Sequence, residues 1–195
     1  GNTELALRVA GLPESARQSL ETVFSASQRA SDLTYQLLVY SGKGKFDMEP
    51  VDLSLLVQDI AGLLELSIER DSELILDCEE PLNGIRGDRS QVQQIVMNLI
   101  INASEAMEGR EGRIEVRTRS VTLTEEEGAL YDGVPAGDYI GLRVTDNGVG
   151  MTPEVKERIF EPFFTSKFAG RGLGMAAVMG IVRAHNGGIC IESEP

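Results

Sequence analysis

The stretch that decides the fold is Asp146-Asn147-Gly148-Val149-Gly150. It follows a strand-like run, residues 139–144, and precedes a helix start at Thr152-Pro153-Glu154. A carboxylate at the end of a strand, backed by two glycines that let the backbone approach a flat ligand, is suited to holding a purine. Because Asp-Asn-Gly is also a favourable turn, the stretch alone is weak evidence. It predicts a nucleotide site only together with the asparagine, phenylalanine and glycine motifs described next.

Two asparagines, Asn98 and Asn102, lie four residues apart in a helix predicted over residues 90–107, so both side chains project from one face. Asparagine is unfavourable in a helix interior and costly to bury without partners. Its neutral oxygen can ligate Mg²⁺ without adding to the acidic charge of the chain. A face whose amides hydrogen-bond to nearby backbone is an equally good interpretation of this pair taken alone.

A second group of motifs lies between residues 160 and 174. Residues 163–167, Phe-Phe-Thr-Ser-Lys, supply hydroxyls and a cation on a loop, and the run 170–174, Gly-Arg-Gly-Leu-Gly, opens a helix predicted over 172–185. Free N–H groups at the start of that helix attract anions, so the run is expected to cradle phosphates. It is not a P-loop, because no Gly-Lys-Ser/Thr follows. At least two of the three phenylalanines Phe160, Phe163 and Phe164 are expected in the core.

The net charge of −13 excludes general nucleic-acid binding, which needs a basic face. The same charge would repel an anionic nucleotide, so Mg²⁺ and a few well-placed basic residues would be needed near the phosphates. The sequence contains no apolar run of about 20 residues and starts without a basic segment. We therefore expect a cytoplasmic chain without direct membrane contact, with any membrane anchor of a parent protein outside it.

The remaining reactive side chains are few. Cys78 and Cys190 form no CxxC pair, which favours a reduced compartment, while a single disulfide remains open. His185 is the only histidine and ends a predicted helix, so we expect a structural role rather than a zinc site.

Hydrophobic spacing predicts an α+β fold with a helix layer on one face of a mixed sheet. A long helix over 13–41 has a narrow apolar seam, which favours pairing with other helices, as in a dimer; packing on its own domain is the alternative. The other expected elements are a strand at 48–53, a helix with apolar Leu55, Leu56, Ile60, Leu63, Leu64 and Ile68, strands at 73–78 and 85–88, a strand at 113–121 paired with 138–145, an acidic loop at 124–137, and a strand starting at 189.

In this order the motifs resemble the conserved boxes of sensor histidine kinases. The segment 94–103 is similar to their N box, 146–150 to the first glycine box, 159–164 to the F box and 170–174 to the second glycine box. Residues 184–188 match the segment that closes the following helix. Four boxes in the right order over about 100 residues are a specific signal. The resemblance covers roughly residues 50–195, and 19–40 resembles the second helix of the dimerisation domain.

The resemblance implies the fold and the domain organisation. The fold would be a two-layer α/β sandwich, a mixed sheet covered by helices, shared with gyrase, Hsp90 and MutL and preceded by a long helix from a dimerisation hairpin. Residues 1–45 would be a truncated hairpin that lacks the phosphoacceptor histidine. Residues 46–195 would be the ATP-binding catalytic domain.

The resemblance also implies roles for the site residues. Asp146 would accept a hydrogen bond from the adenine amino group, and Gly148 and Gly150 would let the backbone close on the ring. Asn102 would ligate Mg²⁺, and Asn98 would support the metal's water shell or the phosphates. The other expected nucleotide-binding residues are Phe164, Thr165, Lys167, Arg171, Gly172, Leu173 and Gly174.

Two departures from related proteins bear on the chemistry. Some kinases carry lysine three residues after the second asparagine, but this chain has Glu105, so the phosphate charge would fall on Lys167 and Arg171. Gyrase-like ATPases place a general-base glutamate where this chain has Asn98. An amide cannot take a proton from water, so a chaperone-type or topoisomerase-type ATPase is disfavoured.

The resulting expectation is a protein-histidine kinase region. It would bind Mg-ATP and transfer the γ-phosphate to a histidine on an upstream helix, for relay to an aspartate of a response-regulator receiver domain. It would form a homodimer through the hairpin, and this chain alone is not expected to autophosphorylate. The alternative is a nucleotide-binding pseudokinase or a dimerising scaffold without transfer activity.

Overall fold

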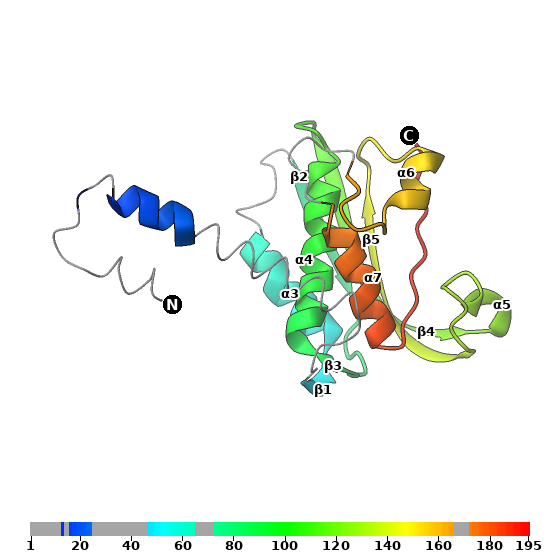
Figure 1. The fold of residues 1–195 in the computed structure, drawn as a ribbon. Coiled ribbons are helices and arrows are strands. Elements are labelled where there is room, and N and C mark those ends of the chain that lie inside the picture. Colours follow the sequence, from blue (N-terminus) through cyan, green and yellow to red (C-terminus); the bar gives the residue numbers. More distant parts are fainter. Residues whose placement is uncertain (1–12, 14–15, 25–46, 65–71, 166–171) are drawn as a thin grey trace.

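The computed structural model describes residue 13 and residues 16–24, 47–64, 72–165 and 172–195 (Figure 1). Residues 16–24 are helical, in agreement with part of the long helix predicted over 13–41. The remainder of that helix lies outside the described residues. The labelled elements are β1 (Met48–Val51), α3 (Leu53–Leu64), β2 (Ser72–Cys78), β3 (Ile85–Asp88), α4 (Arg89–Glu105), β4 (Gly112–Leu123), α5 (Glu125–Gly128), β5 (Gly137–Asp146), α6 (Pro153–Arg158) and α7 (Gly174–Ala184).

The strands form one mixed sheet and one small antiparallel pair. In the mixed sheet, β4 lies in the centre, parallel to β2 and antiparallel to β5. The pairing of β4 with β5 confirms the one predicted from sequence and ends where Ile114 faces Asp146. β1 pairs with β3. Asp146 therefore lies at the last paired position of an edge strand, where the chain leaves the sheet.

Helices α3, α4 and α7 cover one face of the mixed sheet (Figure 1). α4 contacts both of the other helices and lies over the sheet, so its apolar side faces the core. The fully buried apolar side chains include Leu56, Val57, Ile60, Val96, Ile100, Ile114 and Val116. This arrangement confirms the expected α+β class and two-layer sandwich. Among the described residues, no helix is long and apolar enough to cross a membrane.

The start of α4 is fixed by Asp88 and His185. One Asp88 carboxylate oxygen accepts the backbone N–H groups of Ser90 and Gln91 (3.0 and 3.2 Å), and the other accepts that of Asp47 (3.1 Å). Burial disfavours the charged form, but the donated hydrogen bonds outweigh burial and hold the pKa of Asp88 below its ordinary value of 3.8.

His185 joins the end of α7 to the start of α4. Its Nε2 accepts the backbone N–H of Asp88 at 3.0 Å, so its Nδ1 carries the proton and donates to the Ile181 carbonyl at 2.8 Å. Both ring nitrogens therefore have partners within the fold. These contacts agree with the structural role predicted for this histidine.

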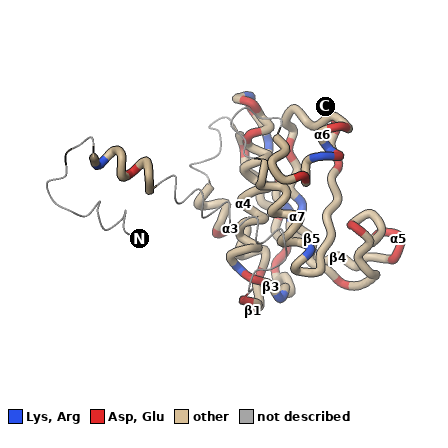
Figure 2. Tube along the Cα trace, viewed as in Figure 1, with Lys and Arg blue, Asp and Glu red and all other residues tan. Residues whose placement is uncertain are grey.

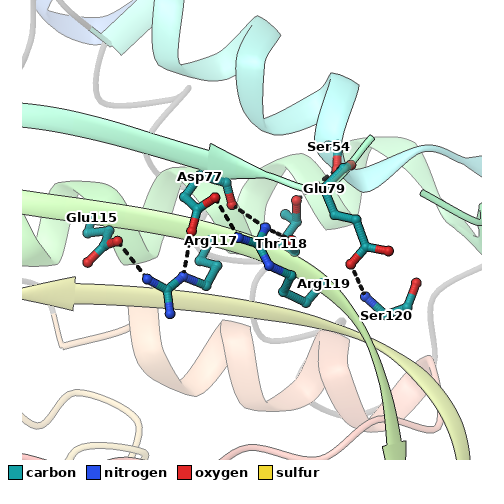
Figure 3. Close-up of polar contacts among 8 residues, drawn as sticks. All are labelled: Ser54, Asp77, Glu79, Glu115, Arg117, Thr118, Arg119 and Ser120. Atoms are coloured by element: carbon teal, nitrogen blue, oxygen red, sulfur yellow. Dashed lines mark hydrogen bonds and ion pairs between the residues drawn. The ribbon is translucent and has the colours of Figure 1, made fainter. Parts of the chain in front are cut away.

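The sheet face away from the helices carries an ionic cluster (Figure 3). Arg117 lies between two acids, 2.9 Å from Asp77 and 2.9 Å from Glu115, and Arg119 binds the second oxygen of Asp77. The Arg119 guanidinium, supported by Arg117, lowers the pKa of Asp77. Glu115, Arg117 and Arg119 alternate along β4 with buried Val116 and Thr118, as expected for a strand with one covered face.

Four sequence predictions about the elements are wrong. The first concerns residues 124–137, predicted as a loop, which contain the short helix α5. Thr124 and Glu127 form a capping box in which the Thr124 hydroxyl accepts the Glu127 N–H (3.2 Å) and the Glu127 carboxylate accepts the Thr124 N–H (2.9 Å). The acidic first turn also suits the positive end of the helix dipole. Figure 2 shows α5 as an acidic segment.

The second wrong prediction is the strand starting at residue 189. Residues 189–195 are described and have no strand assignment. They instead contact the glycine loop that follows β5: Ser193 Oγ accepts the Met151 N–H at 2.9 Å. The chain therefore contacts that loop at this point without pairing as a strand.

The third wrong prediction is the end of strand β1, and the fourth is the buried face of the helix α3 that follows it. The strand expected over 48–53 ends at Val51, because Asp52 accepts the Leu55 N–H (3.1 Å) and so favours a helix start. Leu55 and Leu63 were expected on the apolar face but are 52% and 69% exposed. The buried face of α3 is shifted toward Leu53, Leu56, Val57, Ile60, Ala61 and Leu64. Ile68 lies outside the described residues.

Candidate nucleotide-binding site

Asn98 and Asn102 project from α4 toward the N-terminus of α7. Asn98 Nδ2 donates to the Gly174 carbonyl at 3.4 Å. A methyl group added at Gly174 would lie 3.6 Å from Asn98 Oδ1 and 4.0 Å from Asn102 Nδ2. Both asparagines are half-buried. The two amides and Gly174 therefore share one location, as the motif spacing required.

The first turn of α7 has no side-chain cap among the described residues. The helix begins at Gly174, two residues later than predicted, because Gly172 has a left-handed conformation (φ 64°). Leu173, the residue before the helix, is buried and caps no N–H with its side chain. The first N–H groups of a helix have no partner within it and carry partial positive charge. This end of α7 can therefore receive an anion beside the asparagine amides.

Gly172 joins this turn to the phenylalanine motif. Its carbonyl accepts the Phe163 N–H at 2.8 Å, and a side chain at this position would collide with the backbone of Phe163 and Phe164. The motif residues on either side of positions 166–171 are thus held together. Lys167 and Arg171 lie outside the described residues.

The phenylalanines are not core residues, contrary to prediction. Phe163 is 61% exposed and has a positive φ of 69°, while Phe160 and Phe164 are half-buried. The Arg158 guanidinium lies 4.3 Å from the centre of the Phe164 ring, a cation–π distance, and also pairs with Glu161 at 3.0 Å. Phe164 is thus packed by a charged neighbour, and Thr165 beside it is exposed.

The loop after β5 is anchored to the end of α4. Asp146 Oδ1 accepts the Gly148 N–H at 3.0 Å, and the Val149 N–H donates to the Ala106 carbonyl at 3.0 Å. Ala106 is the C-cap of α4. One helix therefore carries both asparagines and, about one turn beyond Asn102, the anchor of the loop that holds Asp146.

The fold itself requires glycine at two positions of this loop, 148 and 150. A methyl group at Gly148 would lie 2.6 Å from the Ala106 carbonyl oxygen, and one at Gly150 would collide with the backbone of Glu194. Gly150 also has a positive φ of 68°. The space left by their missing side chains is filled by the chain's own backbone, whereas the sequence suggested room for a ligand.

Sequence reasoning missed four residues that shape the site: Ala106, Asn147, Arg158 and Ser193. Asn147 Oδ1 accepts the Arg113 N–H at 2.7 Å and so ties the loop to β4. Its place inside an Asp-Asn-Gly turn was the only signal, because asparagine is common where side chains bond to nearby backbone. The contribution of Ala106 comes from its backbone carbonyl, which no sequence pattern reveals.

The donor set fits the group that the motifs imply. Two neutral amides and the first N–H groups of α7, which have no partner within the helix, can bind a phosphate and its hydrated Mg²⁺ without adding negative charge to an acidic chain. Asp146, exposed at the end of β5, has a carboxylate that can accept a hydrogen bond from a base.

Comparison with known proteins also indicates a nucleotide-binding domain. The family model described as "Histidine kinase-, DNA gyrase B-, and HSP90-like ATPase" matches residues 87–195. The sensor kinase CckA of Brucella abortus is 37% identical over 171 residues, which are 86% of this chain and 18% of CckA. The chain thus spans less than a third of the length of this relative.

Two solved structures share the fold. Full-length ShkA in complex with AMPPNP has a TM-score of 0.64 at 23% identity, over 90% of this chain and 35% of ShkA. The histidine kinase ThkA in complex with the response regulator TrrA has a TM-score of 0.58 at 21% identity, over 89% of this chain and 46% of ThkA. None of these similarities favours the pseudokinase alternative. The chain belongs to the family of histidine kinase-, DNA gyrase B- and HSP90-like ATPases, and it contains an ATP-binding catalytic domain of the sensor histidine kinase type.

Proposed function

We propose that this chain binds Mg-ATP between α4 and α7 and donates the γ-phosphate to a histidine on an upstream helix. The observation that carries the proposal is the meeting of Asn98, Asn102 and Gly174 at a helix start without a side-chain cap. Amides and free backbone N–H groups at one point suit a polyphosphate, whose oxygens accept hydrogen bonds. Leu173 and Gly174 would contribute N–H groups, and Lys167 and Arg171 would add positive charge.

The adenine would lie at the other end of α4. Asp146 would accept a hydrogen bond from the adenine amino group, while Gly148 and Gly150 keep the loop close to the end of α4 and to Glu194. Because Ala106 anchors this loop on the helix that bears Asn102, the separation of the adenine and phosphate sites is set by α4. The nucleotide complex of ShkA supports a nucleotide in this fold.

Asn102 is the proposed ligand of Mg²⁺, and Asn98 supports the phosphates or the water around the ion. Bound Mg²⁺ neutralises phosphate charge. An amide at position 98 cannot remove a proton from water, so the site favours transfer to a positioned nucleophile over hydrolysis. Catalysis by this chain would consist of orienting the phosphate, which alone can lower a barrier by several kcal/mol.

The partners follow from the same proposal. The acceptor histidine would lie on an upstream helix of a dimerising hairpin, and the phosphate would pass to an aspartate of a receiver domain in the cytoplasm. The structure of ThkA with the response regulator TrrA supports this class of partner.

The test uses the protein extended upstream through the hairpin, incubated with γ-labelled ATP and Mg²⁺. The expected result is an acid-labile, alkali-stable label that requires Mg²⁺ and disappears when the upstream histidine is replaced. Asn98→Glu serves as a second arm: a glutamate can act as a general base toward water, so this variant should hydrolyse ATP faster than the original protein. No gain in hydrolysis would contradict the role assigned to the amide at position 98. ATP binding without any label would contradict the kinase proposal.

A further inference from the structure

We infer that Asn147 is a positioning residue that orients Asp146 for the adenine. The inference rests on the proposed function, because it concerns how well the Asp146 carboxylate can meet a base. It assigns to the Asn147 side chain the task of ending the β4–β5 pairing at the right residue.

The first step is the end of the strand pair. Ile114 and Asp146 are the last partners of β4 and β5, so the next residues, Arg113 and Asn147, would face each other if the strands continued. Instead, the Arg113 N–H donates to the Asn147 side-chain oxygen at 2.7 Å. That oxygen takes the acceptor role that a strand carbonyl would otherwise fill. The main chain is thus free to turn away immediately after Asp146.

The second step is the direction of the turn. Once released from β4, the chain folds back so that the Gly148 N–H donates to Asp146 Oδ1 at 3.0 Å. The Val149 N–H then bonds to the Ala106 carbonyl, and the Met151 N–H bonds to Ser193 Oγ at 2.9 Å. Of these four hydrogen bonds, the one from Arg113 to Asn147 is the one that ties this loop to the strand next to β5.

The third step separates positioning from stability. The Arg113–Asn147 hydrogen bond is exposed, so water can bond to the Arg113 N–H when the side chain is removed. The fold should therefore persist in Asn147→Ala. The loop would lose its fixed departure point from the sheet, and the Asp146 carboxylate would sample more orientations. Asn147→Ala should therefore weaken nucleotide binding, and this loss of affinity should depend on the presence of the Asp146 carboxylate.

The experiment is a double-mutant cycle on the full chain, with ADP and excess Mg²⁺ as the probe in calorimetry. Asn147→Ala should weaken ADP binding roughly two- to tenfold, the range for one hydrogen bond. In an Asp146→Asn background the same change should have less than about a twofold effect, because there is no carboxylate left to orient. Asn147→Asp keeps the oxygen acceptor and should restore most of the affinity.

The control is Asn83→Ala, an exposed asparagine on the β2–β3 connection, which should bind ADP like the original protein. Unchanged affinity in Asn147→Ala, an effect of equal size in both backgrounds, or no recovery in Asn147→Asp would overturn the inference. If the original protein fails to bind ADP, or Asp146→Asn binds as well as the original, the proposed function fails and the inference with it. Normal binding by the original, weakened by Asp146→Asn only, would refute the Asn147 role alone.

Discussion

At Gly148 the chain has room for a hydrogen atom but not for a methyl group. The Ala106 carbonyl carbon and oxygen would lie 2.7 and 2.6 Å from an added Cβ, closer than such atoms normally approach. Gly62, in the last turn of α3, has no atom of the described residues within 4 Å of the same position. The two glycines therefore form a matched pair for separating the need for space from the general cost of glycine.

We predict opposite effects for the two alanine substitutions. Gly148→Ala should lower the free energy of unfolding by about 1–3 kcal/mol, because the loop must move away from the end of α4. It should also weaken ATP binding, since Asp146 moves with the loop. Gly62→Ala should raise the free energy of unfolding by about 0.5–1 kcal/mol, because alanine is the better helix former. Urea denaturation measures both, and a Gly148→Ala protein as stable as the original would contradict the contact with Ala106.

At the level of elements, α4 connects most of the features that matter. Its N-terminus is capped by Asp88, its apolar face fills the core, its polar face carries Asn98 and Asn102, and its C-cap anchors the loop of Asp146. A shift of this helix would move the two halves of the site together. A change that destabilises the N-terminus of α4 is therefore expected to affect the site as well.

For Asp88→Asn we expect a pH-dependent loss of stability. The folded-state pKa of Asp88 lies below its unfolded value of about 3.8, so the carboxylate stabilises the protein above that pH. This contribution is lost as the pH falls through the folded pKa. Asparagine keeps the size but loses the charge and one acceptor oxygen, which should cost about 1 kcal/mol at pH 7. The difference from the original protein should start to shrink as the pH falls below about 4 and continue to shrink as the pH falls through the folded pKa.

Denaturation curves at pH 7 and pH 3 provide the measurement. Asp59→Asn is the control, because Asp59 is 66% exposed and pairs only at the surface with Arg89. It should change the free energy of unfolding by less than about 0.5 kcal/mol at pH 7. A difference for Asp88→Asn that stays constant down to pH 3 would refute the role of the charged cap.

The elements differ in how far sequence could predict them. Long periodic segments such as α4 and the β4–β5 pair were predicted closely, because a repeated apolar face leaves one consistent packing. α5 was missed because its capping box lies inside an acidic, glycine-containing stretch that also suits a loop. The strand expected at residue 189 was wrong because a strand needs a partner, and the segment contacts the Met151 loop instead.

For the site, sequence supplied the residue types and the structure supplied their neighbours. Asn98 and Asn102 could be placed on one face by spacing alone, but their meeting with Gly174 depends on how α7 packs on α4. The contacts of Gly148 and Gly150 with distant backbone could not be predicted, because backbone atoms carry no sequence signature.

The whole molecule is an acidic protein that binds an acidic ligand. At long range, where the summed charge of the chain matters more than any single side chain, the net charge of −13 repels an anionic nucleotide. Figure 2 shows acidic residues on several elements, including the tip formed by α5. In the proposed function, attraction would therefore have to come from groups close to the phosphates, namely helix N–H groups, Mg²⁺ and a few basic side chains.

This balance predicts an unusual salt dependence for association. Raising NaCl from about 10 to 150 mM shortens the screening length from about 30 to 8 Å, which weakens the long-range repulsion more than contacts within the site. The association rate constant of fluorescently labelled ATP, in constant excess Mg²⁺, should therefore rise roughly two- to fivefold. Labelled adenosine, which has no phosphate, is the matched control and should associate at the same rate at both salt concentrations. Stopped-flow mixing measures both rates. A rate for ATP that falls with salt would mean that local positive charge governs the encounter, and that the net charge of the chain does not.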